Sequence, residues 1–192
     1  MLRFDMLLSD RYRDALGLAF ELHRTQERKA SGVPYVAHVI GVSSLALEYG
    51  ADEDGAIAAL LHDAVEDQGG PPVLARIQRE FGDKVASIVE LCTDSLEKPK
   101  LPWRPRKERY VAHLRDAPPD AQLVSACDKL YNLRSIIADY RTAGETLWQR
   151  FAGGREGVLW YYRALGAAFS AENPVTSEFR RTLAELERLL GE

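Results

Sequence analysis

The stretch from Ile57 to Asp67, with the sequence Ile-Ala-Ala-Leu-Leu-His-Asp-Ala-Val-Glu-Asp, decides the fold. Its apolar residues recur three and four positions apart, which is the spacing of one face of an α-helix. On such a helix His62 and Glu66 stand one turn apart, and so do Asp63 and Asp67. The sequence therefore predicts one buried helix with an imidazole and three carboxylates near its C-terminal end. A bound cation would relieve their unfavourable interaction with the helix dipole.

The same helical periodicity extends along the rest of the chain, and no segment alternates as a half-buried strand does. Asp52 is a candidate N-cap for the central helix, and Thr142 and Glu145 have the spacing of a capping box for a short helix. The Pro-rich segment 97–109 is expected to be an exposed, semi-extended loop. We predict an all-α, single-domain helical bundle of about nine or ten helices, among them segments near 8–27, 35–49, 83–96, 106–114 and 118–140.

Composition limits the function classes. The chain has 192 residues, 46% hydrophobic and 28% charged, with a net charge of −4, so one domain is expected and a nucleic-acid partner is not. No stretch is long enough to span a membrane, and residues 1–13 do not form a signal peptide. Cys92 and Cys127 do not have metal-site spacing and are expected to be reduced core cysteines. These features predict a cytoplasmic protein that does not bind membranes.

Two further ionisable residues stand among apolar neighbours, His38 at Tyr35-Val36-Ala37-His38 and Asp128 at Ala126-Cys127-Asp128. Each alone would most often be a hydrogen-bonded core residue. Together with His62 and Asp63 they give the order His, His-Asp, Asp. Two imidazoles and two carboxylates suit a borderline-to-hard divalent cation such as Mn²⁺, with coordination positions left open for water and substrate.

This order resembles the signature of the HD superfamily of metal phosphohydrolases. A narrower resemblance, to the hydrolase domain of RelA/SpoT-type alarmone enzymes, is carried by four segments and covers roughly residues 15–165. The segments are 23–29 with 34–38, 59–67, 81–85 with Thr93 and Asp94, and 128–135. The resemblance implies an HD-domain fold over residues 1–192, with C-terminal helices at 155–190 packed on the core. It also implies a stand-alone small alarmone hydrolase.

The resemblance also implies roles for individual residues. It implies that one Mn²⁺ is held by His38, His62, Asp63 and Asp128. Glu66 and Asp67 match the pair of acidic residues that position or deprotonate the attacking water. The residues expected near the substrate are Arg24, Arg28, Lys29 and Asn132, with Lys100, Arg104, Arg106 and Lys107 as further candidates at the mouth of the site.

The implied reaction is that of a guanosine-3′,5′-bis(diphosphate) 3′-pyrophosphohydrolase. Metal-dependent hydrolysis of the 3′-diphosphate would release pyrophosphate and a nucleoside 5′-di- or triphosphate, so the partner is a small nucleotide. Two alternatives stay open at this stage. The same site could act on adenosine alarmones or on another nucleotide phosphate such as the 2′-phosphate of NADPH, or the protein could be a non-catalytic alarmone receptor. The sequence does not indicate which group distinguishes guanine from adenine.

Overall fold

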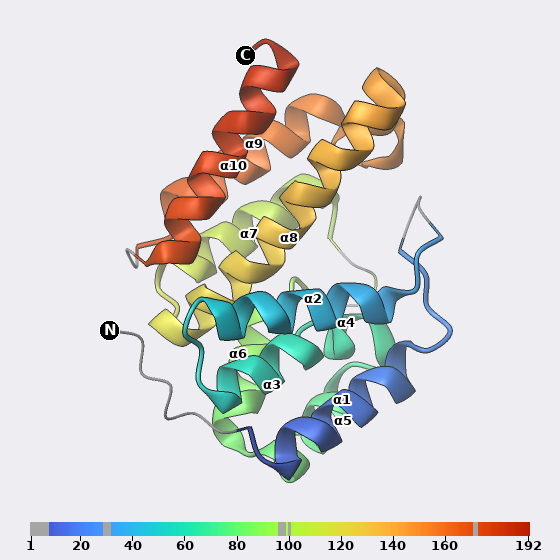
Figure 1. Ribbon diagram of the computed structural model, residues 1–192, viewed down its shortest axis with the longest axis vertical. Helices are drawn as coiled ribbons and strands as arrows, with labels where there is room; N and C mark the ends of the chain where they lie inside the picture. The colour runs from blue at the N-terminus through green and yellow to red at the C-terminus, as the bar shows by residue number, and fades with distance from the viewer. Residues whose placement is uncertain (1–7, 29–31, 96–98, 100, 171–172) are drawn as a thin grey trace.

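The computed structural model describes residues 8–28, 32–95, 99, 101–170 and 173–192. Within these residues the chain forms ten α-helices and one 3₁₀ helix, and the described part contains no strand. This confirms the predicted all-α class (Figure 1). The helices are α1 Asp10–His23, α2 Tyr35–Glu48, α3 Glu53–Leu61, α4 Ala64–Gln68, α5 Pro71–Phe81, α6 Asp83–Cys92, α7 Trp103–Arg115, α8 Pro119–Ala143, η1 Gly144–Arg150, α9 Gly154–Ala168 and α10 Pro174–Leu190.

Helix α3 lies at the centre of the N-terminal half. Every residue from Gly55 to Leu61 is buried, and α1, α2, α6 and α8 all pack against this helix. The Asp52 side chain accepts a hydrogen bond from the Gly55 N–H at 2.9 Å, which confirms the predicted N-cap. Because α3 is covered on several sides, it holds the residues that follow it deep inside the bundle.

Helices α2 and α8 approach closely at one point. Gly41 of α2 faces the ring of Tyr131 of α8, and a Cβ atom at Gly41 would lie 2.2 Å from Tyr131 Cε2. His38 lies three residues before Gly41, and Asp128 lies three residues before Tyr131. The absence of a side chain at Gly41 therefore allows two of the predicted metal ligands to face each other across this contact.

The C-terminal helices form a second tier of the molecule. In Figure 1, α8 runs from the N-terminal helices into the upper part of the molecule, where α9 and α10 lie. Helix α10 packs against α8 and α9, and α7 packs against α9. The second half of α8 is thus covered by helices from the end of the chain.

The predicted continuous helix through Asp67 is wrong. Helix α3 ends at Leu61, α4 begins at Ala64, and His62 and Asp63 lie at the junction. Consecutive residues of a continuous helix point about 100° apart, so a change in the backbone between α3 and α4 alters how the His62 and Asp63 side chains lie relative to each other. The backbone of Asp63 has φ −98° and ψ −4°, and this departure lets its carboxylate approach the His62 ring.

Two other local predictions are also corrected. Helix α7 begins at Trp103, although 97–109 was expected to be an exposed loop; Pro105 is accommodated because the first turn of a helix has N–H groups without partners inside it. Thr142 does not begin a new helix. It lies inside α8, and its hydroxyl donates to the Ala138 carbonyl at 3.3 Å. Helix α8 ends at Ala143 and is capped by Gly144, whose φ is +58°.

Candidate metal centre and adjoining cavity

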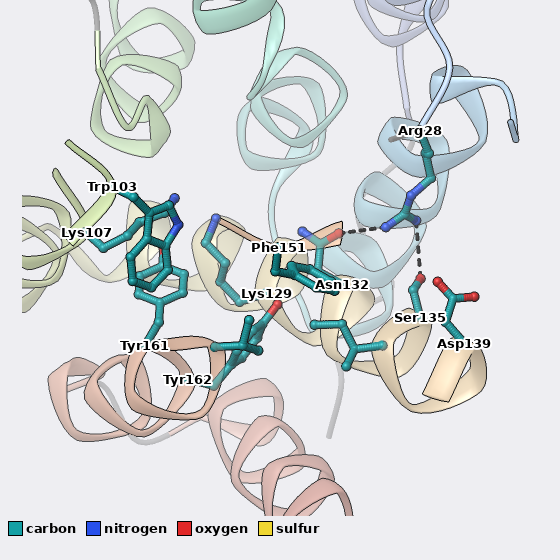
Figure 2. A pocket seen from close by; sticks show the side chains of 12 residues that line it. Arg28, Trp103, Lys107, Lys129, Asn132, Ser135, Asp139, Phe151, Tyr161 and Tyr162 are labelled. Atoms are coloured by element: carbon teal, nitrogen blue, oxygen red, sulfur yellow. Dashed lines mark hydrogen bonds between the residues drawn. The ribbon is translucent and has the colours of Figure 1, made fainter. Parts of the chain in front are cut away.

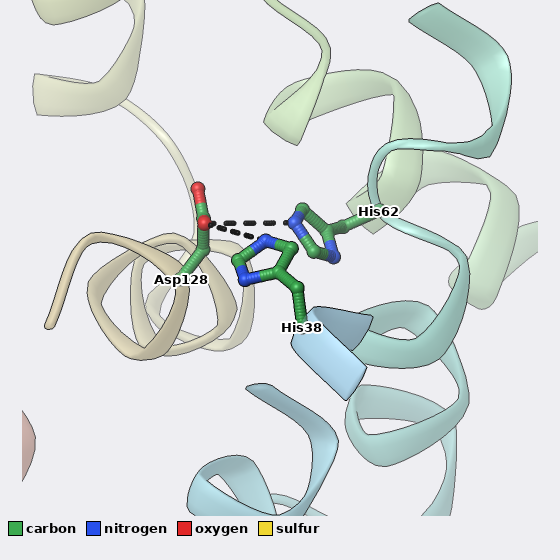
Figure 3. A group of neighbouring side chains, drawn as sticks. All are labelled: His38, His62 and Asp128. Carbon is green, nitrogen blue, oxygen red and sulfur yellow. Dashed lines mark ion pairs between the residues drawn. The ribbon is translucent and has the colours of Figure 1, made fainter. Parts of the chain in front are cut away.

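Three buried side chains from separate elements converge in the middle of the bundle: His38 of α2, His62 after α3, and Asp128 of α8 (Figure 3). Oδ1 of Asp128 lies 3.3 Å from Nε2 of His38 and 3.6 Å from Nε2 of His62. One ligand atom from each residue lies within 4.8 Å of the other two, which is a spacing suited to one metal ion.

Asp63 joins the same cluster. Its Oδ2 lies 3.0 Å from Nε2 of His62 and 3.6 Å from Nε2 of His38. The hydroxyl of Tyr35 donates a hydrogen bond to this carboxylate. The structure therefore brings together all four residues for which the sequence predicted a role as metal ligands.

The hydrogen bonds of His62 test whether the cluster fits a cation. Its Nδ1 lies 2.8 Å from the carbonyl oxygen of Ala59 and must carry the proton, because a carbonyl only accepts. In the neutral ring, Nε2 then presents a lone pair to Asp63 and Asp128. Nε2 of His62 is buried and has no hydrogen-bond partner in the described structure. A lone pair facing two carboxylates needs a positive charge between them, so the donor set fits a divalent cation.

The electrostatics of the cluster agree with this requirement. Burial opposes the charged form of His62, but the neighbouring carboxylates of Asp63 and Asp128 hold its pKa well above the usual value. Burial likewise disfavours ionised Asp128, but Lys129, His38 and His62 hold the pKa of its carboxyl well below the usual value. The cluster therefore favours ionised carboxylates and attracts positive charge, as a proton or as a metal ion.

Asn132 links this cluster to the predicted substrate residues. Its Nδ2 donates to Oδ1 of Asp128 at 2.6 Å, and its Oδ1 accepts from Nη2 of Arg28 at 2.8 Å. Nη1 of Arg28 also donates to the hydroxyl of Ser135 at 3.2 Å. Arg28 and Asn132 thus lie side by side next to the metal cluster, where the sequence predicted substrate contacts.

The predicted catalytic pair lies on α4, and its two carboxylates have different surroundings. Glu66 is half-buried, and its Oε2 accepts the Asp94 N–H at 3.2 Å, with Nη1 of Arg106 3.9 Å from Oε1. Asp67 is exposed, and its Oδ2 accepts a hydrogen bond from Nε2 of Gln26 at 2.7 Å.

The remaining basic residues that the sequence predicted near the substrate lie in different surroundings. Arg24 is exposed at the end of α1 and is not part of the cavity wall described below. Lys29 and Lys100 lie outside the described residues. Arg106 pairs with Asp94, and the Arg104 guanidinium lies 3.3 Å from the Trp160 ring centroid, on the ring face. Of the described candidates from this segment, Lys107 alone lines the cavity.

A cavity of about 300 Å³ adjoins the metal cluster at Lys129 and Asn132 (Figure 2). Lys129 donates a hydrogen bond to Asp128, as Asn132 does, so both residues connect the cavity wall to a predicted metal ligand. A volume of this size is at the lower end of small-molecule sites. The lining residues are Arg28, Trp103, Lys107, Lys129, Asn132, Ser135, Ile136, Asp139, Phe151, Val158, Tyr161 and Tyr162.

Sequence reasoning missed most of this wall. Tyr161 and Tyr162 were not among the predicted site residues, yet both are buried and both line the cavity. Burial raises the pKa of each phenol, so both stay neutral at physiological pH. The run of aromatic residues at 160–162 was the available signal in the sequence. Which of these side chains face the cavity depends on how α9 packs beside α7.

The fold and the four-residue cluster form a candidate metal centre, and comparison with known proteins identifies the family. Residues 15–159 match the sequence model of the HD domain family, and the chain belongs to that family. Similar curated proteins include guanosine-3′,5′-bis(diphosphate) 3′-pyrophosphohydrolase MESH1 of Mus musculus, 39% identical over 126 residues, which are 64% of this chain and 68% of the relative. The Drosophila melanogaster MESH1 is 36% identical over 67% of this chain and 70% of the relative.

A solved structure extends the similarity to the whole fold. It is described as a metazoan ortholog of SpoT that hydrolyzes ppGpp, and it matches 97% of this chain and 98% of its own chain. The TM-score is 0.78 at 29% identity. No helix in the described part of this chain is both long enough and apolar enough to cross a bilayer.

Proposed function

We propose that this protein is a metal-dependent 3′-pyrophosphohydrolase of guanosine alarmones. The observation that carries the proposal is the His38, His62 and Asp128 cluster, which adjoins a cavity lined by three basic side chains. The similarity to proteins named for this activity supports the same substrate class. The pairing of a cation site with basic residues suits a substrate that carries several phosphate charges.

The proposed ligands are His38, His62, Asp63 and Asp128, and Mn²⁺ is the ion that we propose they hold. When bound, such an ion polarises a phosphoryl oxygen and acidifies a coordinated water. Lys129 and Lys107 would neutralise phosphate charge on the cavity side of the cluster. Arg28 and Asn132 would contact the nucleoside, because they hold each other beside Asp128.

In the proposed chemistry, water attacks the phosphorus atom next to the ribose 3′-oxygen. The bond from that phosphorus to the 3′-oxygen breaks, the 3′-oxygen takes up a proton to become the ribose 3′-hydroxyl, and pyrophosphate and a nucleoside 5′-di- or triphosphate are released. Glu66 would accept the proton of the attacking water. Its carboxylate is held by the Asp94 N–H, which fixes the orientation of the base. Asp67 would orient the water or relay the proton.

We also propose that residues 1–192 act as one hydrolase domain. Support comes from the cavity wall, to which α9 contributes Tyr161 and Tyr162 while α8 contributes Asn132. The C-terminal helices would then complete the substrate site. Arg24 and Lys29 remain predicted substrate contacts, and the cytoplasmic location remains a prediction.

The decisive experiment is hydrolysis of guanosine and adenosine 3′-diphosphates side by side, with Mn²⁺ and with chelator, and with pyrophosphate quantified. We expect pyrophosphate release from the guanosine substrate only when the metal is present. The phosphate released from NADPH, measured in the same assay, tests the alternative substrate. Tight binding of guanosine alarmones without any product would favour the receptor interpretation and overturn the proposal.

A further inference from the structure

The cavity beside the metal cluster has two chemically different sides (Figure 2). Lys107 lies on one side, near Trp103 and Tyr161, and Lys129 lies between this side and Asn132. Ser135 and Asp139 lie on the opposite side, where Arg28 enters. Lys107 and the carboxylate of Asp139 therefore lie on opposite sides of the cavity in this view, with Lys129 between them.

Asp139 is unusual among the lining residues. Of the described side chains that form the cavity wall, it alone carries a carboxylate. The side chain is partly exposed, and no hydrogen bond or ion pair joins it to another described residue. Arg28 is close by, but its guanidinium donates to Asn132 and Ser135 instead. The two oxygens of Asp139 thus remain available to a ligand in the cavity.

A phosphate in direct contact with Asp139 would be repelled by its carboxylate, because like charges at contact distance repel each other. The phosphates are expected beside Asp128, where Lys129 supplies positive charge. The neutral part of the nucleotide, its base, would then extend toward Asp139. A carboxylate with two free oxygens accepts hydrogen bonds from two adjacent N–H donors.

Guanine offers such a pair, N1–H and the N2 amino group, along one edge. Adenine presents an acceptor, N1, beside its N6 amino group, so a carboxylate there would face a lone pair. Hypoxanthine keeps N1–H but lacks the amino group at position 2. The carboxylate therefore discriminates among the three purines by the number of donors that it can pair with.

We propose that Asp139 is the residue that selects guanine in this cavity. This inference rests on the proposed function, which identifies the ligand as a purine nucleotide. It adds the specificity determinant that the sequence did not indicate.

Measurements of nucleotide affinity separate the selection of the base from catalysis. The affinities of GDP, IDP and ADP are measured by calorimetry for the wild type, Asp139→Asn and Asp139→Ala. Asp116→Asn is the matched control, because Asp116 is exposed at the end of α7 and is not part of the cavity wall. Turnover of guanosine and adenosine 3′-diphosphates is followed for the same proteins.

We expect the wild type to bind GDP at least about 10-fold more tightly than ADP, with IDP between them, since a bidentate contact gives discrimination of that order. Asp139→Ala should abolish the difference. Asp139→Asn should shift the preference toward ADP, because an amide both accepts from N6 and donates to N1 of adenine. The control should retain the wild-type order.

Three results would overturn the assignment. They are no preference for GDP in the wild type, an unchanged preference in Asp139→Asn, or an equal loss of affinity for GDP, IDP and ADP in the Asp139 variants. The last would give Asp139 a ribose-binding or structural role. If neither alarmone were hydrolysed while the GDP preference still depended on Asp139, the proposed function would fail and the assignment of Asp139 would stand.

Discussion

Asn132 donates a hydrogen bond from Nδ2 to Oδ1 of Asp128, 2.6 Å away and one turn earlier on α8. The same amide accepts from Arg28 through its Oδ1. One side chain therefore holds a proposed metal ligand on one side and a cation of the cavity wall on the other. This arrangement couples the position of Arg28 to the metal cluster without making Arg28 part of it.

Replacing Asn132 by alanine should separate these two roles. Arg28 would lose its amide partner, so we expect KM for the guanosine alarmone to rise about 10-fold, the order expected for a hydrogen bond to a charged group. Metal content should be unchanged, because the proposed ligands remain. Arg28→Ala should have a similar effect, and the double variant should be less than additive. Loss of metal in Asn132→Ala would instead show that the amide is needed to hold Asp128.

Metal removal gives a second prediction, which does not depend on turnover. Chelator-treated wild type should gain thermal stability when Mn²⁺ is added, by about 2.7 kcal/mol at a free-ion concentration of 100 times Kd. His62→Ala should lose this gain because a ligand is removed. His113→Ala is the control, since His113 is exposed on α7. A full gain in His62→Ala would reject the ligand assignment.

The same cluster predicts how metal affinity depends on pH. The neighbouring carboxylates hold the pKa of His62 well above its usual value, so without metal the ring keeps its proton to a higher pH than a free imidazole does. Metal binding must displace that proton, and affinity should rise as the pH is raised through neutrality. Calorimetry in buffers of different ionisation enthalpy should detect proton release. An affinity that does not change with pH would contradict the protonated state.

Sequence reasoning found the metal cluster because each of its residues departs from a local pattern. His38 and Asp128 interrupt apolar helical faces, and His62 with Asp63 ends one, but each alone is weak evidence. The order His, His-Asp, Asp and the resemblance to the HD superfamily made them candidate ligands. Sequence reasoning did not find the break after Leu61, because the turn at His62 and Asp63 contains neither glycine nor proline. The stabilising contacts at that turn, such as the hydrogen bond from Tyr35 to Asp63, come from a different helix.

The cavity wall was harder to predict for the same reason. Asp139 and Tyr161 come from α8 and α9, and Lys107 comes from a helix whose proline-rich start indicated a loop. None of these residues has a local signal that distinguishes a cavity wall from an ordinary helix face. Their convergence depends on how α7, α8 and α9 pack, which a single sequence does not specify.

Glu66 should be required for the chemical step and not for binding. In Glu66→Gln the amide oxygen can still accept the Asp94 N–H, so the side chain should stay in place while losing its ability to take a proton. We expect kcat to fall by at least about 100-fold, the lower end for a positioned base, with metal and nucleotide affinity retained. Asp67→Asn should cause a smaller loss. A larger loss in Asp67→Asn than in Glu66→Gln would exchange the two roles.

The contact between Gly41 and Tyr131 should control the geometry of the metal centre from outside it. A Cβ atom at Gly41 would lie 2.2 Å from Tyr131 Cε2, so Gly41→Ala forces the ring or the helices to move. We expect a loss of about 1–3 kcal/mol in the free energy of unfolding, typical of overpacking. Metal affinity should fall as well, because α2 carries His38 and α8 carries Asp128.

Two further variants separate this clash from the general effect of placing alanine in a helix. Gly17 of α1 is exposed, and a Cβ atom there would have no atom within 4 Å, so Gly17→Ala should stabilise the protein or leave it unchanged, since alanine favours helix. Adding Tyr131→Ala to Gly41→Ala removes the clashing ring and should restore part of the metal affinity measured by calorimetry. If Gly41→Ala bound metal like the wild type while unfolding more easily, the contact would stabilise the fold without positioning His38 against Asp128.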